Sequence, residues 1–273
     1  MRKILYLIVL LPIMVVGQEN YVKTTVYRDS LVQKPQVNIT YFDGLGRPIQ
    51  QIAHQQSGTG LDIITPIEYD AFGRQVKEYL PYVPKPTDPV SLDYRSNALQ
   101  DQPNFAQYAG QISYSEKLFE SSPLNRVLKQ AAPGNDWAMP ATAGDPDHTV
   151  NFDYLTNGEN EVKLFTAMAE MNPTNTIYNI SFGQSGGNYY DPNQLYKTVT
   201  KDENWDSNNN TNEHTTEEFK DKEGRVILKR TYNQGDPHDT YYVYDQYGNL
   251  TYVIPPLVTD ISDEDQLNGL CYQ

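Results

Sequence analysis

The sequence predicts an all-β protein made of antiparallel β-hairpin repeats, with no long helix after the first residues. Two observations lead to this fold class. A short motif with turn chemistry recurs along the chain, and β-forming residues flank each copy. Beyond residue 18, no segment has the apolar period of an amphipathic helix longer than about two turns. A turn that recurs at similar spacing predicts a stack of hairpins rather than an active site.

The motif runs aromatic, Asp-x-x-Gly, Arg or Asn, and then an apolar residue. It occupies residues 41–49, 69–76, 219–226 and 244–250. The first two Asp residues are 27 residues apart and the last two 24. An Asp that opens a turn can accept a hydrogen bond from the amide two residues on, and Gly at the fourth position adopts positive φ without steric cost. Each copy therefore predicts a strand, a tight turn and a second strand.

A degenerate copy follows at residues 122–128, where Asn125 takes the place of Gly. Asn is the next most tolerant residue for positive φ, so the turn is expected to persist. The Arg that closes most copies receives no role from the sequence. The predicted turn residues are Asp43, Gly46, Arg47, Asp70, Gly73, Arg74, Asn125, Arg126, Asp221, Gly224, Arg225, Asp245, Gly248 and Asn249.

The chain begins with the features of a secretory signal peptide, assigned to residues 1–18. Arg2 and Lys3 precede an apolar run over 4–16, and small residues stand near Gly17. The 13-residue run is shorter than the ~20 residues that a spanning helix needs, so no transmembrane span is expected in the mature chain. We therefore expect a secreted or cell-surface protein.

Charge and cysteine content narrow the functional classes. The formal net charge is −14, and loss of Arg2 and Lys3 with the signal peptide makes it −16, which disfavours nucleic-acid partners. Cys271 is the only cysteine, so no intrachain disulfide can form. Tyr (22) outnumbers Phe (8), and only 38% of residues are hydrophobic, which suits two-faced sheets better than a compact enzyme core.

The rest of the chain divides into five regions by composition. Residues 19–80 form an N-terminal β region with two motif hairpins, and the Pro-rich residues 81–110 form a connection, either mobile or packed over a sheet edge. Residues 111–200 are a β-rich middle region, 201–257 carry the last motif hairpins, and 258–273 form a C-terminal tail. Local patterns also predict a short helical turn over Ala167–Met171, a flexible loop over 183–187 and a turn at Gly235-Asp236-Pro237.

The Tyr-Asp-x-x-Gly-Arg motifs resemble the YD repeats of bacterial RHS (rearrangement hotspot) proteins. The resemblance is carried by Tyr41–Gln50, Phe119–Gly134 and Phe219–Tyr252 and covers most of residues 19–257 behind the signal peptide. In that family the repeats form a long curved sheet that closes into a hollow shell around a variable C-terminal domain, often a toxin. The resemblance implies that the chain is a non-enzymatic scaffold, whose partners are the remainder of a shell or a C-terminal effector.

The sequence departs from the family in two respects. It is far shorter than a closed shell requires, and it lacks both the RHS core motif and a C-terminal effector. Tyr272 resembles the start of another strand. These departures lead us to expect an N-terminal fragment or a truncated gene product. Oligomeric state is not predicted.

A calcium-binding loop is the most specific alternative to a purely structural role. Oxygen-bearing side chains recur with the ligand spacing of an EF-hand loop, at Asp202, Asn204, Asp206, Asn208, Asn210 and Glu213. However, Ser207 stands where the loop needs Gly, and strand-like residues flank the segment. An Asn/Asp-rich hairpin tip explains the same composition, so calcium binding is kept only as an alternative. No other cofactor is expected.

Enzymatic patterns are weak. The acidic pairs, such as Glu217-Glu218, are expected to be a solvated surface, because Asp and Glu are usually exposed. The four histidines have no metal-ligand spacing and are expected at the surface or in turns. The Gly-x-Ser-x-Gly spacing at 183–187 lacks the strand–turn–helix context of a nucleophile elbow. A cell-surface module for glycan or protein, with Tyr189 or Tyr241 stacking on the ligand, is the second functional hypothesis.

Overall fold

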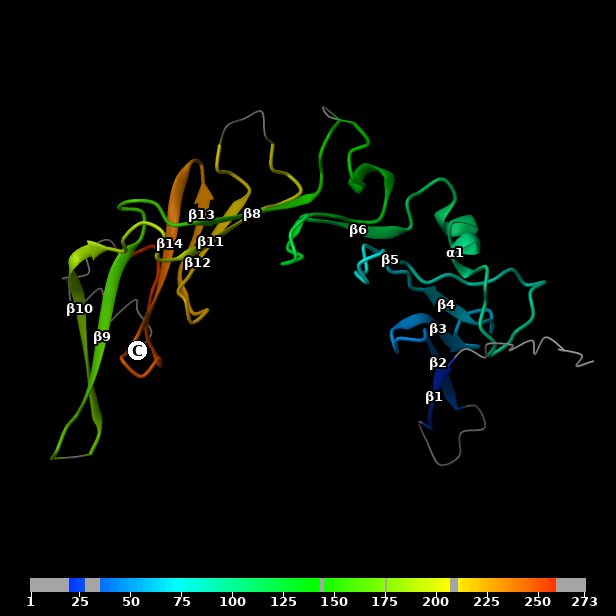
Figure 1. Ribbon diagram of the computed structural model, residues 1–273, viewed down its shortest axis with the longest axis horizontal. Helices are drawn as coiled ribbons and strands as arrows, with labels where there is room; N and C mark the ends of the chain where they lie inside the picture. The colour runs from blue at the N-terminus through cyan, green and yellow to red at the C-terminus, as the bar shows by residue number, and fades with distance from the viewer. Residues whose placement is uncertain (1–19, 28–34, 143–144, 175, 207–210, 259–273) are drawn as a thin grey trace, which may run out of the picture. The chain divides into compact units, whose positions relative to one another are not determined.

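The computed structural model describes residues 20–27, 35–142, 145–174, 176–206 and 211–258. The predicted signal peptide, Cys271 and Tyr272 lie outside these residues. The chain forms two compact units, residues 1–113 and 114–273, which are described separately. Strands dominate both units, all the strand pairs within them are antiparallel, and the longest described α-helix has four residues (Figure 1). The predicted all-β fold class is confirmed.

The first unit contains a four-stranded antiparallel sheet with its strands in sequence order. Its strands are β1 (Asn20–Val26), β2 (Gln36–Phe42), β3 (Pro48–His54) and β4 (Ile63–Pro66). Ile39, Ile52 and Ile64 are directly paired across β2, β3 and β4. Directly paired residues point to the same face, so these three side chains form one buried apolar row.

The Pro-rich segment covers this apolar row. The segment contains α1 (Ala98–Asp101) and the 3₁₀ turns η1 (Gln102–Asn104) and η2 (Ala106–Tyr108), and the short strand β5 (Lys77–Tyr79) precedes it. Tyr82 and Ala98 are 3% and 2% exposed and belong to the same core as Ile64. The segment therefore packs on the sheet, because the sheet has an apolar face to bury.

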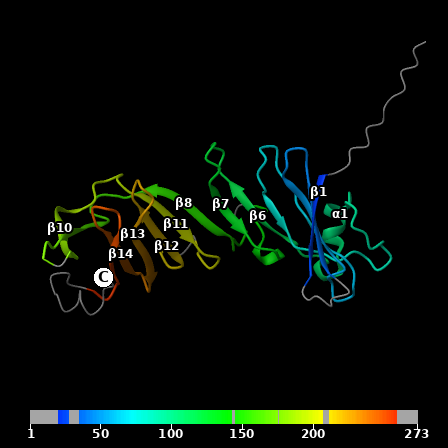
Figure 2. The same ribbon diagram turned by 90° about the horizontal axis from the view of Figure 1, so that it is seen from below.

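The second unit is built on a larger antiparallel sheet, whose strands lie side by side in Figure 2. Within this unit the strand order is β15-β14-β13-β12-β11-β8-β7-β6, and η3 (Asn135–Trp137) lies between β7 and β8. The strands are β6 (Tyr114–Phe119), β7 (Val127–Ala131), β8 (Val150–Thr156), β11 (Tyr196–Lys201), β12 (Thr215–Lys220), β13 (Val226–Asn233), β14 (Asp236–Tyr244) and β15 (Leu250–Ile254).

A separate hairpin, β9 (Lys163–Met171) and β10 (Tyr178–Tyr189), packs on one face of this sheet (Figure 1). Phe165 and Ala167 are buried at alternate positions of β9, and the Phe165 ring meets the Tyr241 ring edge to face at 4.9 Å. The predicted helical turn over Ala167–Met171 is wrong. Strand alternation places Phe165, Ala167 and Ala169 on one face, and the sheet core buries them.

Two further local predictions are corrected. Residues 183–187 belong to strand β10 rather than to a loop, and the Gly-rich stretch is taken up by a register shift between Gln184 and Tyr189. The turn before β14 consists of Gln234 and Gly235, with φ of 55° and 85°. Two residues with positive φ make the tight hairpin turn that matches strand twist, so Asp236 already pairs with Asn233.

Candidate functional site

The recurring motif is the site that the sequence singles out, and its four Asp-x-x-Gly copies have one geometry. In the copy at 221–225, Asp221 Oδ1 accepts the backbone N–H of Glu223 at 3.0 Å and of Arg225 at 2.9 Å. The Gly224 N–H donates to the Asp221 carbonyl at 3.1 Å. The same three bonds recur in the turns that begin at Asp43, Asp70 and Asp245. In each turn, one carboxylate oxygen thus accepts two backbone N–H groups, and the Asp carbonyl accepts a third.

The fourth residue of each turn requires a left-handed backbone. Gly73 has a φ of 79° and Gly248 a φ of 84°, and Gly46, Gly224 and Asn125 also have positive φ. Pairing then shifts register at the start of the turn, for example between Val243 and Tyr244. A type I turn followed by a left-handed residue and a bulge is a common three-residue hairpin connection.

The motif arginine, unassigned by the sequence, binds the second oxygen of the same Asp. Arg47 Nε and Nη2 donate to Asp43 Oδ2 at 2.8 and 2.7 Å. Arg74 and Arg225 make the same Nε bond to Asp70 and Asp221, at 2.8 and 2.7 Å. The aspartate therefore uses one oxygen on the backbone and the other on the guanidinium, which fixes the side-chain direction of the arginine.

The oriented arginine reaches a tyrosine that lies later in the chain. Arg47 Cζ lies 4.4 Å from the centroid of the Tyr69 ring, and Tyr69 is the aromatic residue of the next motif. Arg225 Cζ lies 5.0 Å from the centroid of Tyr244, again in the next motif. Arg126 has the same relation to Tyr154 at 4.7 Å. These are cation–π distances.

Each of these tyrosines also donates its hydroxyl back to the earlier turn. Tyr69 Oη donates to the carbonyl of Pro48 at 2.9 Å, and Tyr244 Oη donates to that of Val226 at 3.1 Å. Tyr154 donates to Val127 at 2.9 Å. In all three cases the acceptor directly follows the motif arginine. The aromatic residue and the arginine therefore form one two-point contact between consecutive hairpins.

The glycine of the later turn makes room for the arginine of the earlier one. A Cβ on Gly73 would lie 3.0 Å from Arg47 Nη1, and a Cβ on Gly248 would lie 3.3 Å from Arg225 Nη1. Glycine at these positions thus has two physical causes, the positive φ and the close approach of a guanidinium. The second cause is invisible in the sequence.

Three copies depart from the pattern. Arg74 lies over Phe72 of its own turn, at 5.0 Å from the ring centroid. In the degenerate copy, Glu120 supplies the carboxylate and binds Arg126 Nε and Nη2 at 2.9 and 2.7 Å. Asn249 replaces arginine in the last copy; its Nδ2 donates to Asp245 Oδ2 at 3.0 Å, and it is too short to reach a later strand.

These contacts lower the pKa of four carboxylates in the turns, those of Asp43, Asp70, Glu120 and Asp245. Hydrogen bonds from the Arg47 and Arg74 backbone lower the pKa of Asp43 and Asp70. The side-chain bond from Asn249 lowers that of Asp245. The Arg126 side chain lowers the pKa of Glu120 to about 2. All four groups are anions at neutral pH. This suits a carboxylate that accepts hydrogen bonds within a turn, whereas a general acid must carry a proton.

Two carboxylates of the proposed calcium loop already have other partners, and two of its residues lie outside the described chain. Asp202 Oδ1 accepts the Asn204 N–H at 2.8 Å, and Asp202 Oδ2 lies 3.3 Å from His214 Nδ1. Glu213 accepts the N–H of Gly235. Asn208 and Asn210 lie outside the described residues, and Asp206 lies just before that gap. Within the described chain, no group of three His, Cys, Asp or Glu side chains has the geometry of a metal site.

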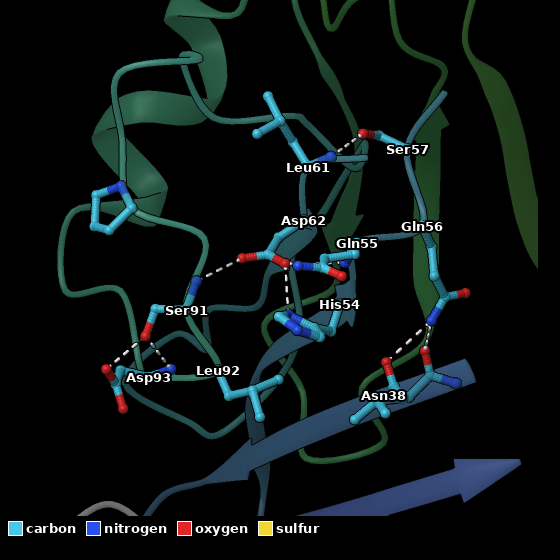
Figure 3. A network of polar contacts seen from close by, with 12 residues as sticks. Asn38, His54, Gln55, Gln56, Ser57, Leu61, Asp62, Ser91, Leu92 and Asp93 are labelled. Atoms are coloured by element: carbon cyan, nitrogen blue, oxygen red, sulfur yellow. Dashed lines mark hydrogen bonds and ion pairs between the residues drawn. The ribbon is translucent and has the colours of Figure 1, made fainter. Parts of the chain in front are cut away.

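A buried carboxylate that the sequence did not single out anchors the Pro-rich segment in the first unit. Asp62 has no exposed side-chain surface and receives His54 Nδ1 at 2.8 Å, the Gln55 N–H at 3.0 Å and the Ser91 N–H at 3.1 Å (Figure 3). Arg95 Nη2 adds an ion pair at 2.9 Å. The partners come from β3, its following turn and residues 91–95, so Asp62 joins segments that lie far apart in the sequence.

The expectation of a solvated surface at Glu217-Glu218 is wrong for Glu217. Its carboxylate lies 2.9 Å from Lys197 Nζ and 3.7 Å from Arg230 Nη1, and the residue is 7% exposed. Arg230 in turn binds Asp239 Oδ1 at 2.6 Å. Glu217, Arg230 and Asp239 are directly paired across β12, β13 and β14. Strand register thus pairs charges that sequence spacing cannot connect.

Tyr241, a candidate for ligand stacking, is 7% exposed and packs on Phe165, so its ring is not available at the surface. Tyr189 is half-buried. His54 is held against Asp62, which the sequence missed, whereas His148, His214 and His238 are exposed as expected. The sequence gives no indication of the Asp62–His54 contact, because the two residues are eight positions apart and a hairpin turn brings them together.

Comparison with known proteins assigns the family. The chain belongs to the family described as Domain of unknown function (DUF6443), whose sequence profile matches residues 16–154. No curated protein shows significant similarity. No described helix is both long and apolar enough to cross a bilayer.

Solved structures of toxin complexes are similar to the chain. One is TcdB2-TccC3 without its hypervariable C-terminal region, at 17% identity over 91% of this chain and 10% of that chain, with a TM-score of 0.47. Another is the Photorhabdus luminescens Tc holotoxin pore, at 18% identity over 86% of this chain and 10% of that chain, with a TM-score of 0.43. The chain spans about a tenth of the length of these structures.

Proposed function

We propose that the chain is a non-enzymatic β-scaffold, the N-terminal part of an RHS-type shell that would enclose or present a C-terminal effector. The observation that carries this proposal is the repeated contact between turns. Arg47, Arg126 and Arg225 each stack on a tyrosine that follows later in the chain, and that tyrosine donates back to the earlier turn. The motif is used to join hairpins in series.

The use of the motif side chains supports a structural role over a catalytic one. Both carboxylate oxygens of Asp221 accept hydrogen bonds from its own turn, and the Arg225 guanidinium contacts Asp221 and Tyr244. A general acid or base must exchange a proton near its working pH, whereas the motif carboxylates with shifted pKa values remain anionic well below neutrality. Export through the signal peptide at 1–18 is part of the same proposal.

The DNA downstream of codon 273 tests the scaffold function. The expected outcome is an open frame with further Tyr-Asp motifs spaced like those at Asp221 and Asp245, followed by an unrelated C-terminal domain. In the product of that frame, the C-terminal domain should resist protease until the repeats are unfolded. A stop codon followed by unrelated sequence, together with saturable binding of the exported chain on a glycan array, would contradict the scaffold and favour the adhesion module.

A further inference from the structure

We propose that the side chains of Lys197 and Glu161 join in an isopeptide bond, which ties the segment just before β9 to strand β11. Lys197 Nζ lies 2.7 Å from Glu161 Oε1 and 2.9 Å from Glu217 Oε1. The amine thus contacts one carboxyl group that it can attack and a second that can carry its protons, which are the groups that amide formation needs. This modification site goes beyond the scaffold function and does not depend on it.

The three side chains lie in a largely buried site. Exposure is 12% for the Lys197 side chain, 21% for Glu161 and 9% for Glu217. Phe219 is directly paired with Lys197 across β11 and β12 and is fully buried, and Lys197 Nζ lies 5.1 Å from its ring centroid. Condensation of an amine with a carboxyl group releases water, so a site that holds little water favours the amide over the separate groups.

Glu217 is placed to carry protons in this reaction. Its Oε1 contacts Lys197, whereas its Oε2 is buried, has no hydrogen-bond partner among the described residues and lies 3.7 Å from Arg230 Nη1. Arg230 makes its short contacts with Asp239 instead, from Nε at 2.6 Å and from Nη2 at 2.9 Å. Glu217 therefore keeps a carboxylate oxygen that is not already occupied by a donor and can take up a proton.

The ion pair is the resting state of the site. Burial lowers the pKa of Lys197, but its hydrogen bonds to Glu161 and Glu217 raise the pKa overall. The reaction therefore starts from the less populated form in which Lys197 has passed a proton to Glu217. The amide then accumulates because, once water has left a buried site, the reverse reaction lacks its second reactant.

The bond forms with a complete balance of atoms. The neutral Nζ of Lys197 attacks Cδ of Glu161, and the C–N bond forms as negative charge collects on the Glu161 oxygens. The Gly158 N–H donates to Glu161 Oε2 at 2.6 Å and stabilises that charge. Two protons of the former ammonium pass through Glu217 to Oε1, the C–Oε1 bond breaks, and water leaves. The third proton stays on the amide nitrogen, and no oxidant, reductant or other reactant is needed.

The bond would tether the hairpin that packs on the large sheet. Glu161 and Lys197 are 36 residues apart, and β9 and β10 lie between them. A cross-link that closes such a loop restricts the unfolded chain. Cys271 is the only cysteine, so an intrachain disulfide cannot supply this tether, whereas a lysine and a glutamate can.

Mass spectrometry of the full chain under denaturing conditions tests the bond. With any removal of the signal peptide taken into account, the measured mass should be lower than the sequence mass by one water molecule. Trypsin should release a branched peptide that joins the segments of Glu161 and Lys197. A chain with the full mass of its sequence, and separate peptides for the two segments, would overturn the proposal.

Variants of the full chain identify the reacting groups, each judged against its own sequence mass. Lys197→Met and Glu161→Leu should lose no water, and Glu217→Gln should lose none although both bonded groups are still present. Lys201→Met is the matched control and should still lose water, because Lys201 lies on the same strand but pairs with Asp153, whose side chain is 45% exposed. Water loss that persists in the Lys197→Met chain would overturn the assignment of the amine, and water loss in the Glu217→Gln chain would overturn the role of Glu217.

Discussion

Arg47 and Tyr69 make a two-point contact between consecutive hairpins. The guanidinium carbon lies 4.4 Å from the ring centroid, and the tyrosine hydroxyl donates to the carbonyl of Pro48, the residue after Arg47. Asp43 Oδ2 orients the arginine by accepting hydrogen bonds from Arg47 Nε at 2.8 Å and Nη2 at 2.7 Å. The aspartate that opens one turn therefore also helps to position the tyrosine of the next motif, because the arginine side chain contacts both.

A double-mutant cycle measures this contact. Arg47→Ala, Tyr69→Ala and the double variant should give a coupling free energy of about 0.5–1 kcal/mol, the usual value of an exposed cation–π pair. Urea unfolding of the first unit provides the measurement. As a control, Arg47→Ala combined with Tyr108→Ala should be additive within about 0.5 kcal/mol, because these two side chains share no partner. Additivity in the Arg47–Tyr69 cycle would show that the stacking carries no energy.

Alanine at two motif glycines should separate backbone strain from the approach of arginine. Gly224→Ala and Gly73→Ala both place a Cβ at positive φ, at a cost of about 1–2 kcal/mol. Gly73→Ala should cost a further ~0.5–1 kcal/mol, since its Cβ would meet Arg47 Nη1 at 3.0 Å and displace the cation–π contact, whereas Gly224 has open space.

Hydrogen exchange in the strands beside each turn, followed during urea unfolding, gives the two costs. In an Arg47→Ala background the additional cost at Gly73 should disappear. If it persists, the guanidinium is not its cause.

The Glu120–Arg126 pair predicts a loss of stability in acid. The pKa of Glu120 is lowered to about 2 from its ordinary 4.5. A carboxylate with a lowered pKa in the folded state stabilises the fold above its unfolded pKa, and this contribution is lost as the pH falls through the folded pKa. Glu120→Gln should therefore be less stable than the parent chain at pH 7. The difference should shrink between pH 4.5 and about 2, as followed by urea midpoints. A difference independent of pH would assign the effect to packing.

Removal of Asp62 should release the Pro-rich segment. Asp62→Ala leaves the partly buried Arg95 guanidinium without its ion pair, which costs at most about 3–5 kcal/mol, the value for a fully buried pair. We expect a lower unfolding midpoint of the first unit and new protease cleavage within residues 83–97. Asp93→Ala, which removes an exposed carboxylate bonded to Ser91, should change stability by less than about 0.5 kcal/mol. Equal effects of the two variants would remove the anchoring role of Asp62.

The all-β class and the motif turns could be predicted from the sequence, because they depend on interactions between neighbouring residues. The all-β class and the four turns follow from Asp and Gly placed three residues apart, because the Asp carboxylate and the Gly backbone act within a five-residue segment. The predictions that failed were equally local. The Ala167–Met171 helical turn and the loop at 183–187 are strands, because the core of the second unit buries alternate residues of β9.

The sequence by itself determined the β class and the strand-turn-strand periodicity, since both depend on preferences of neighbouring residues. Only the tertiary structure decided what the motif arginine does. Arg47, Arg126 and Arg225 contact tyrosines 19 to 28 residues away, and only the tertiary arrangement brings those partners together. The same holds for Asp62 with Arg95 and for Glu217 with Arg230. Burial and cross-strand pairing are set by the whole sheet, so no short stretch of sequence encodes them.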